Sequence, residues 1–205
     1  GLLHALHAFH GKEIDKYNLA RKAIHVEQNL IKDTVGSQDQ TAAAFGGLNK
    51  IDFPPNGKII ITPVSLPPKR LDLFKNHLML FFTGIIRKSS DIENNKVRNF
   101  SNKENELKKM FSMVEPAVKI LKNGNLNDFG RMLHESWMLK RSLSKEVSND
   151  HIDRAYNKAK EAGAIGGKLL GAGGGGFILI FSSPEKQEAV RREMKKIKFL
   201  EIPFK

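Results

Sequence analysis

The most constraining feature of the chain is a glycine-rich stretch near its C-terminus, KLLGAGGGGFILIF at residues 168–181. Gly171 and Gly173–Gly176 stand between two short apolar runs of the kind that form buried strands. Glycine has no Cβ atom, so it adopts positive φ readily and lets a backbone or a ligand approach closely, at a cost in conformational entropy. We therefore predict a strand, a glycine-rich loop and a second strand. A plain hairpin is the alternative, but a hairpin needs only a two-residue turn, which favours a functional loop.

This stretch does not match the common phosphate-binding loops. A Walker A loop needs Lys-Ser or Lys-Thr after its last glycine, where this chain has Phe177. The dinucleotide fingerprint G-x-G-x-x-G can be placed on Gly171, Gly173 and Gly176, but that motif opens a helix, and a strand-like run follows here. We expect the loop to support a phosphate site made elsewhere rather than to form one alone.

The composition of the chain bears on whether it binds nucleic acid or crosses a membrane. The net charge of +12 and the pI of about 9.8 are compatible with nucleic-acid binding. The basic residues are scattered, however, and the aromatic residues do not alternate with them as a base-stacking surface requires. Anionic substrates or solubility explain the charge equally well. We therefore predict neither a nucleic-acid partner nor, since no apolar run is long enough, a membrane span.

Cysteine is absent, which excludes disulfides, thiolate metal sites and cysteine nucleophiles. No signal peptide is recognisable, because residues 1–9 are apolar but have neither a basic lead nor a small-residue cleavage site. Both observations fit a cytoplasmic protein. The chain begins within a helical pattern and ends on a strand-like run, so we expect it to be a segment of a longer protein.

Two acidic residues in the first third are candidates for chemistry. Glu27 lies in an apolar row of a helix expected from Asp15 to about Ile31, either at the rim of its buried face or aimed into a site. Asp39 is the single carboxylate in VGSQDQTAAAFGG at residues 35–47. It is either the N-cap of a short helix, a role that Ser37 could also take, or a general base beside small residues.

Further candidates follow a break at Pro67-Pro68, which predicts a boundary between domains at 1–68 and 69–205. Thr83 and Arg87 come just after a buried strand expected at 77–82, where a hydroxyl and a cation could hold a phosphate or a sugar; an ordinary strand exit is the alternative. Lys140 lies on a helix one turn beyond Trp137. His134 of that helix is expected to be buried and hydrogen-bonded, because HESWM lacks the second histidine of H-E-x-x-H.

Taken together, VGSQDQTAAAFGG and KLLGAGGGGFILIF resemble the GHMP kinase family, and the resemblance covers nearly the whole chain. GGLNKIDF, LFFTGIIRKSS, LHESWMLKRSLS and AGAIGGKLLGAGGGGF are similar to the branch of that family that phosphorylates heptoses. The resemblance implies a two-domain α+β fold. Its C-terminal domain would be ferredoxin-like, with an antiparallel sheet packed on helices, and its N-terminal domain would be incomplete in this chain.

The resemblance also implies an activity, the transfer of the ATP γ-phosphate to a sugar hydroxyl. The expected acceptor is D-glycero-D-manno-heptose 7-phosphate, in the synthesis of nucleotide-activated heptose. Asp39 matches the family's active-site aspartate, and Glu27 resembles its acidic Mg²⁺ ligand. Residues 171–176 match the third family motif, which supports the phosphate loop. Thr83, Arg87 and Lys140 resemble branch positions that could hold the sugar's phosphate. ATP and Mg²⁺ are the implied cofactors, and a homodimer is compatible with the family.

The chain departs from the family pattern near its N-terminus. The family's substrate-binding first motif and its Gly/Ser-rich ATP loop are not recognisable, which implies that the chain as given is incomplete and inactive alone. Two alternatives therefore stay open. One is a fucose- or galactose-type kinase that acts on a neutral sugar, and the other is a non-catalytic binding protein with this fold.

Overall fold

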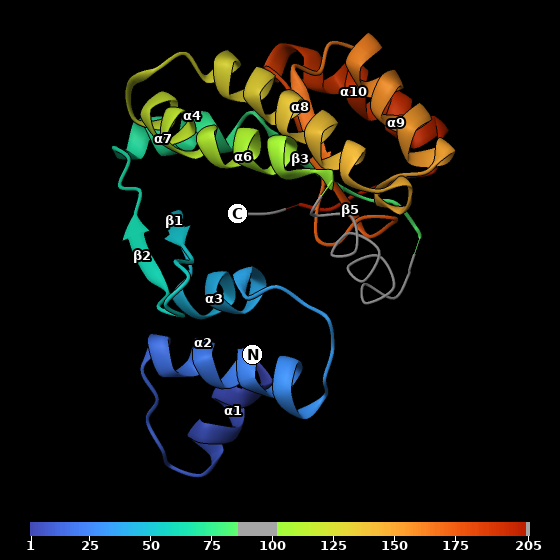
Figure 1. The fold of residues 1–205 in the computed structure, drawn as a ribbon. Coiled ribbons are helices and arrows are strands. Elements are labelled where there is room, and N and C mark those ends of the chain that lie inside the picture. The colour runs from blue at the N-terminus through green and yellow to red at the C-terminus, as the bar shows by residue number, and fades with distance from the viewer. Residues whose placement is uncertain (86–101, 204–205) are drawn as a thin grey trace. The chain divides into compact units, whose positions relative to one another are not determined.

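The computed structural model describes residues 1–85 and 102–203, and it divides into two compact units, Gly1–Ser65 and Leu66–Lys205. The boundary lies close to the division predicted after residue 68. Figure 1 shows the units in colours that run from blue at the N-terminus to red at the C-terminus. Each unit is described by itself below. No helix within the described ranges is long and apolar enough to cross a membrane.

The first unit consists of helices followed by a small antiparallel ribbon. Its elements are α1 (Leu2–Phe9), α2 (Lys16–His25), a π-helical turn η1 (Val26–Leu30), α3 (Gln38–Phe45), β1 (Asn49–Asp52) and β2 (Ile60–Pro63). Asp15 begins α2, because its carboxylate accepts a hydrogen bond from the backbone N–H of Asn18 at 2.8 Å. Helices α2 and α3 pack against each other (Figure 1), and β1 pairs with β2 from Asn49–Pro63 to Asp52–Ile60.

The π-helical turn corrects one expectation about the core. The helical spacing of Leu19, Ala23, Val26 and Leu30 predicts that they form the buried stripe of this helix. Leu30 is instead 65% exposed, and Ala20, from the neighbouring row, is buried. A π turn holds an extra residue, so it breaks the 3.6-residue period on which the predicted stripe depended.

The second unit is an antiparallel sheet with helices. Its elements are α4 (Pro68–Lys75), β3 (Leu78–Phe82), α6 (Glu104–Ser112), α7 (Val114–Asn123), α8 (Leu126–Leu143), a 3₁₀ turn η3 (Lys145–Val147), α9 (Asp150–Glu161), β4 (Gly166–Leu169), β5 (Phe177–Phe181), α10 (Pro184–Lys196) and β6 (Leu200–Glu201). The strand order is β4-β5-β3-β6, and every pairing is antiparallel. This is the ferredoxin-like order that we predicted.

The core of this unit forms where alternate strand residues meet the helices. Met79 and Phe81 of β3 and Ile178 and Ile180 of β5 point to one face and are almost completely buried. Helices α8, α9 and α10 lie on this side of the sheet (Figure 1). These helices contribute large buried side chains to the core, which are Trp137, Ile152, Tyr156, Val190 and Met194, and the turn η3 adds Val147.

Two helical predictions need correction. Apolar residues at helical spacing between Leu107 and Leu121 predict one long helix. The structure has two, α6 and α7, because Pro116 has no N–H to bond the carbonyl of Ser112 and its ring would clash there. Helix α4 was not predicted, since the double proline was interpreted only as a break. Proline is acceptable in the first turn of a helix, and Pro68 occupies that position.

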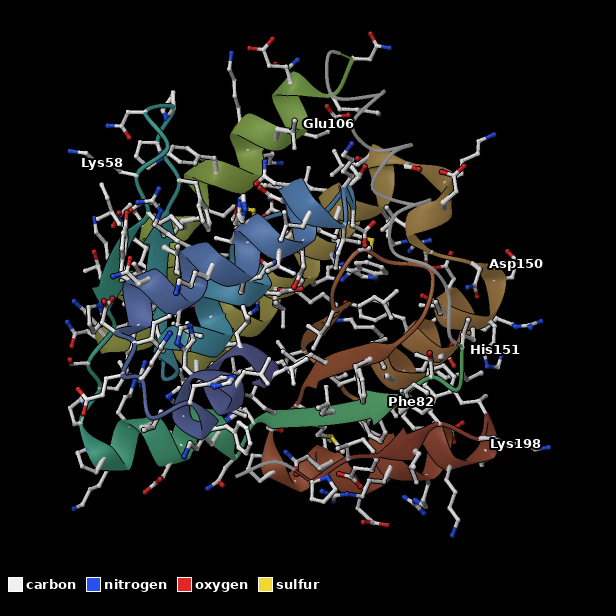
Figure 2. The ribbon with its side chains drawn as sticks, turned by 90° about the horizontal axis from the view of Figure 1, so that it is seen from below. Lys58, Phe82, Glu106, Asp150, His151 and Lys198 are labelled. Atoms are coloured by element: carbon white, nitrogen blue, oxygen red, sulfur yellow. The ribbon has the colours of Figure 1, made fainter. Side chains whose placement is uncertain are left out.

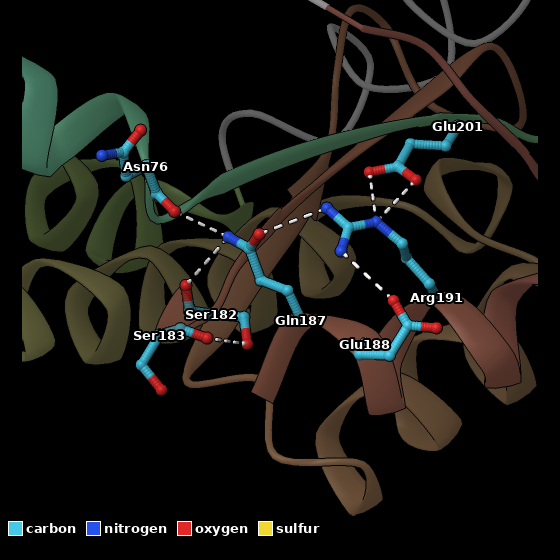
Figure 3. Close-up of polar contacts among 7 residues, drawn as sticks. All are labelled: Asn76, Ser182, Ser183, Gln187, Glu188, Arg191 and Glu201. Carbon is cyan, nitrogen blue, oxygen red and sulfur yellow. Dashed lines mark hydrogen bonds and ion pairs between the residues drawn. The ribbon is translucent and has the colours of Figure 1, made fainter. Parts of the chain in front are cut away.

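Helix α10 is fastened to the neighbouring elements by polar contacts (Figure 3). The Nε of Arg191 donates to both carboxylate oxygens of Glu201 on β6, at 3.0 and 2.9 Å. The side chain of Gln187 donates to the carbonyl of Asn76 at 2.6 Å, in the turn before β3. These contacts tie α10 to β6 and to the turn that precedes β3.

Candidate functional site

In the first unit, the short helix α3 carries Asp39 in its first turn. Ser37 is the N-cap residue, and Asp39 follows it in the helix, so the capping role considered for Asp39 is wrong. The hydroxyl of buried Thr41 donates to the carbonyl of Ser37 at 2.7 Å and closes this turn. The Asp39 side chain is exposed, which leaves its carboxylate accessible to a ligand.

Glu27 lies in the π-helical turn and is joined to α3. The side-chain nitrogen of Gln40 donates to its carboxylate at 2.5 Å. A carboxylate can only accept hydrogen bonds, so the Gln40 amide must turn its nitrogen toward Glu27. The other amide atom, Oε1 of Gln40, is buried without a hydrogen-bond partner in the described part of the chain. Glu27 is therefore a half-buried side chain held by the residue next to Asp39, and π turns are frequent at functional sites.

Whether a metal ion can bind at Glu27 depends on the oxygen ligands that this side chain and its neighbours offer. Among residues 1–85 and 102–203, no three His, Cys, Asp or Glu side chains cluster closely enough to hold a metal ion. Glu27 offers one carboxylate, of which one oxygen accepts the bond from Gln40. Mg²⁺ is commonly bound by one or two carboxylates together with substrate phosphate oxygens and water. The residues present fit a magnesium ion that arrives with a phosphate ligand and do not fit an all-protein metal site.

In the second unit, the glycine-rich loop lies between β4 and β5, as predicted from the sequence. Two other backbone segments hold it. The N–H of Gly174 donates to the carbonyl of Val147 at 2.9 Å, and the N–H of Gly176 donates to the carbonyl of Ile85 at 2.8 Å. These two N–H groups are thus occupied by the protein itself.

Close packing explains why glycine is needed there. A Cβ atom on Gly173 would lie 2.7 Å from the carbonyl oxygen of Val147, and one on Gly175 would lie 2.5 Å from that of Ile85. Gly173 also has a φ of 118°, which side chains rarely allow. The loop therefore joins the antiparallel strands β4 and β5 and is clamped by two other backbone segments.

Thr83 and Lys140 both contact this loop. Figure 2 shows Phe82 at the end of β3, directly before Thr83. The buried hydroxyl of Thr83 donates to the carbonyl of Gly176 at 2.9 Å. The ammonium of Lys140 donates to the carbonyl of Gly171 at 2.5 Å. The structure thus brings both residues to the ends of the loop, whereas Arg87 lies outside the described residues.

His134 is hydrogen-bonded, as the sequence predicted, but it is half-buried rather than buried. Its Nδ1 is hydrogen-bonded to the hydroxyl of Tyr156 at 2.7 Å, and the two rings stack. Burial, with Lys160 and Arg141 nearby, lowers the pKa of His134 below its usual value. Burial also raises the pKa of Tyr156, so its hydroxyl stays neutral. This pair belongs to the packing between α8 and α9.

Sequence reasoning missed Gln40 and Asn149. Asn149, rather than Asp150, is the N-cap of α9, and its side-chain nitrogen also donates to the carbonyl of Gly174 at 3.2 Å. The run Ser148-Asn149-Asp150 is rich in capping residues and could have indicated the helix start. No local pattern indicates the partner of Gln40 or the contact of Asn149 with the loop, because both partners are distant in the chain.

Comparisons with known proteins agree with this architecture. Residues 117–199 match the model of the family "GHMP kinases C terminal". The chain is 32% identical over 200 residues to a D-glycero-alpha-D-manno-heptose 7-phosphate kinase of Campylobacter jejuni, covering 94% of this chain and 59% of that protein. It is 26% identical over 184 residues to a bifunctional fucokinase/GDP-fucose pyrophosphorylase of Arabidopsis thaliana, covering 86% of this chain and 17% of that protein. The chain therefore spans about three fifths or less of the length of these relatives.

A solved structure extends the comparison to the fold. A D-glycero-D-manno-heptose 1-phosphate kinase from Bacteroides thetaiotaomicron superimposes with a TM-score of 0.73 at 25% sequence identity, covering 99% of this chain and 56% of that one. The ferredoxin-like unit, the clamped glycine-rich loop and the match at residues 117–199 together lead to one conclusion. The chain has the α+β fold seen in GHMP kinases, and its residues 117–199 match the C-terminal domain of that family.

Proposed function

We propose that this chain is part of an ATP-dependent sugar kinase that phosphorylates a hydroxyl of D-glycero-D-manno-heptose 7-phosphate. The observation that carries the proposal is the 32% identity to a heptose 7-phosphate kinase across 94% of the chain. The structure supports it with an accessible carboxylate at Asp39, a held carboxylate at Glu27 and a clamped glycine-rich loop.

In the proposed reaction, Asp39 orients the acceptor hydroxyl and accepts its proton as the bond to phosphorus forms. Phosphoryl transfer has a loose transition state, so positioning and charge neutralisation contribute more than the strength of the base. An exposed carboxylate in the first turn of α3, which Thr41 closes, suits this task. Asp39 is therefore the residue whose loss separates binding from turnover most clearly.

Glu27 is the proposed ligand of Mg²⁺. When bound, the ion neutralises phosphate charge and so lowers the barrier to transfer. The part of this chain is to present the Glu27 carboxylate, and Gln40 fixes the direction of that carboxylate through its hydrogen bond.

The glycine-rich loop backs the proposed phosphate site. Thr83 and Lys140 hold its two ends through the carbonyls of Gly176 and Gly171. The ammonium of Lys140 also donates to the carbonyl of Leu169 at 3.4 Å. Its proposed contact with the sugar's phosphate rests on the sequence similarity. Arg87, outside the described residues, is proposed to bind the same phosphate on sequence similarity alone.

The first experiment measures ADP release by the full-length gene product with Mg-ATP and D-glycero-D-manno-heptose 7-phosphate. Asp39→Asn is expected to lower kcat by about 10²- to 10⁴-fold, the usual contribution of a positioned proton acceptor. Asp33→Asn is the matched control, because the Asp33 side chain has no hydrogen bond or ion pair to the described residues. Equal turnover in the Asp39 variant and the wild type would remove the role of Asp39 while keeping the kinase.

The similarity to a fucokinase favours one alternative acceptor, a neutral sugar. The same assay with L-fucose, D-galactose and a heptose 1-phosphate in place of the heptose 7-phosphate decides between them. The proposal expects the highest kcat/KM for the heptose 7-phosphate. A higher value for a neutral sugar would replace the acceptor, and no turnover with any of these sugars would favour a non-catalytic binding protein.

A further inference from the structure

The glycine-rich loop is held on one side by the turn between η3 and α9. Gly174 donates to the carbonyl of Val147, and the packed Cα of Val147 leaves no space for a side chain on Gly173. Val147 is completely buried in the core, so its carbonyl is a fixed acceptor. The position of the loop therefore depends on what fixes residues 147–149.

Asn149 connects this turn to the loop and to α9 at once. Its Oδ1 accepts hydrogen bonds from the backbone N–H groups of His151 and Ile152, both at 3.1 Å. Its Nδ2 donates to the carbonyl of Gly174 at 3.2 Å. The two donors from α9 require an oxygen on their side, so the nitrogen must face Gly174. Figure 2 shows Asp150 and His151, which follow Asn149 at the start of α9.

A partly buried ion pair fixes the same turn. The guanidinium of Arg141 on α8 donates to Oδ2 of Asp153 on α9 at 2.5 Å, and the two side chains are 30% and 27% exposed. Oδ1 of Asp153 accepts from the hydroxyl of Ser148 at 2.5 Å. The contacts form a series. Arg141 holds Asp153, Asp153 holds Ser148, and Ser148 directly precedes Asn149, whose side chain contacts the loop.

We propose that Asn149 is a positioning residue for the glycine-rich loop, with Ser148, Asp153 and Arg141 holding it in place. In this arrangement the start of α9 determines where the loop lies, because the amide nitrogen of Asn149 holds the carbonyl of Gly174 by a hydrogen bond. The link to catalysis rests on the function proposed above. The effect of Asn149 on the loop does not depend on that function, because it can be measured without turnover.

The test separates positioning from simple helix capping. Asparagine, aspartate and serine cap helices about equally well. Asn149→Ser keeps a cap and removes the donor to Gly174. Asn149→Asp also keeps a cap, but it sets a carboxylate oxygen against the carbonyl of Gly174. Capping alone predicts that both variants resemble the wild type, whereas positioning predicts that the loop loosens in Asn149→Ser and loosens more in Asn149→Asp.

The readout is amide hydrogen exchange of the full-length protein, followed by mass spectrometry on peptides that cover 170–177 and 150–161. The loss of one hydrogen bond is expected to speed exchange at 170–177 about two- to tenfold in Asn149→Ser, with little change in α9. Asn125→Ser and Asn125→Asp are the matched controls, because Asn125 caps α8 through the N–H of Asn127 in the same way and is exposed. They should leave exchange at 170–177 unchanged.

Unchanged loop exchange in both Asn149 variants, with α9 intact, would overturn the proposal. An equal response to the Asn125 variants would do so as well. If the Asn149 variants fail to fold, Ser148→Ala replaces them, since it removes only the contact with Asp153; it should also speed exchange at 170–177, and no response there would overturn the proposal.

Kinetics of the same variants then connect the loop to the reaction. We expect Asn149→Ser to lower kcat more than it changes the KM for ATP. The reason is that the position of the loop matters most in the transition state of phosphoryl transfer, where the charge on the phosphate redistributes. If the wild-type protein shows no turnover, the proposed function fails while the exchange result still decides the role of Asn149. Faster loop exchange with unchanged kcat would keep Asn149 as a loop-positioning residue and remove its link to catalysis.

Discussion

Lys140 shows how the role of one residue depends on its contacts. The sequence resemblance suggested that it binds the sugar's phosphate, and in the structure its ammonium donates to the carbonyl of Gly171. A lysine on a helix can serve both purposes only if the loop and the phosphate lie within reach of the same ammonium. Kinetics with charged and neutral acceptors can separate the two roles.

We predict that Lys140→Ala raises the KM for a heptose 7-phosphate about ten- to 100-fold, which corresponds to the loss of one charge-assisted hydrogen bond. The KM for a neutral sugar should change little. Lys145→Ala, at an exposed position in η3, is the control and should leave both values unchanged. An equal rise for both sugars would instead assign Lys140 to loop support.

His134 gives a prediction about pH. Burial holds the pKa of folded His134 below its ordinary value of 6.5, so between these two values the unfolded chain binds more protons than the folded one. Stability is therefore complete above pH 6.5 and falls as the pH is lowered through that value. Urea unfolding between pH 5 and pH 8 should show this loss.

The variant His134→Gln should make the pH dependence shallower, because it removes the proton-binding group and retains a polar side chain for Tyr156. His10→Gln, at the exposed end of α1, is the control and should leave the slope as in the wild type. A slope that persists unchanged in His134→Gln would assign the dependence to other groups.

At the scale of elements, the glycine-rich loop requires glycine both for its own backbone conformation and for the close approach of neighbouring segments. Gly175 has no positive φ, so its requirement for glycine comes only from the close carbonyl of Ile85. Gly171 and Gly176 have positive φ values and open space around the Cβ position. Glycine is thus required in this loop for two different reasons, a positive φ at some positions and the absence of a Cβ atom at another.

Gly175→Ala is expected to lower the free energy of unfolding by about 1–3 kcal/mol, the usual cost of overpacking. Gly36→Ala is the matched control, since that glycine has open space and no positive φ, and its effect should stay within about 0.5 kcal/mol. Urea denaturation of both variants measures the difference. A neutral Gly175→Ala would mean that the backbone at Ile85 moves away at little cost.

At the scale of the whole molecule, the second unit is held together by contacts between segments far apart in the sequence. Arg70 of α4 donates to three backbone carbonyls at the end of α7, those of Ile120, Leu121 and Gly124, at 2.7, 2.9 and 2.5 Å. Carbonyls in the last turn of a helix have no partner within the helix, so this arginine caps α7 from another element.

Arg70→Met should therefore destabilise the second unit by about 2–3 kcal/mol, because it leaves these carbonyls without their charged donor while retaining an apolar stem. Lys69→Met, on the exposed side of the same helix, should change stability by less than about 0.5 kcal/mol. Denaturant unfolding, followed by a probe in the second unit such as Trp137 fluorescence, measures both. Equal stability of the two variants would show that water replaces the arginine.

Much of the fold could be predicted from the sequence because its signals are local. Short continuous apolar runs predicted β3 and β5. The glycine run predicted the strand–loop–strand connection, and the family resemblance implied the ferredoxin-like unit. Asp39 and Glu27 could be named as candidates because few carboxylates occur among small or apolar residues in that region.

The tertiary structure alone decided which partners these residues have. Gly166 must be glycine because a Cβ there would lie 1.9 Å from the carbonyl of Gly130, a residue of α8 far away in the chain. The bond from Gln40 to Glu27 and the contact of Asn149 with Gly174 depend on packing in the same way. Periodicity and capping involve neighbouring residues, so a sequence displays them, whereas the partner of a side chain exists only after distant segments have packed together.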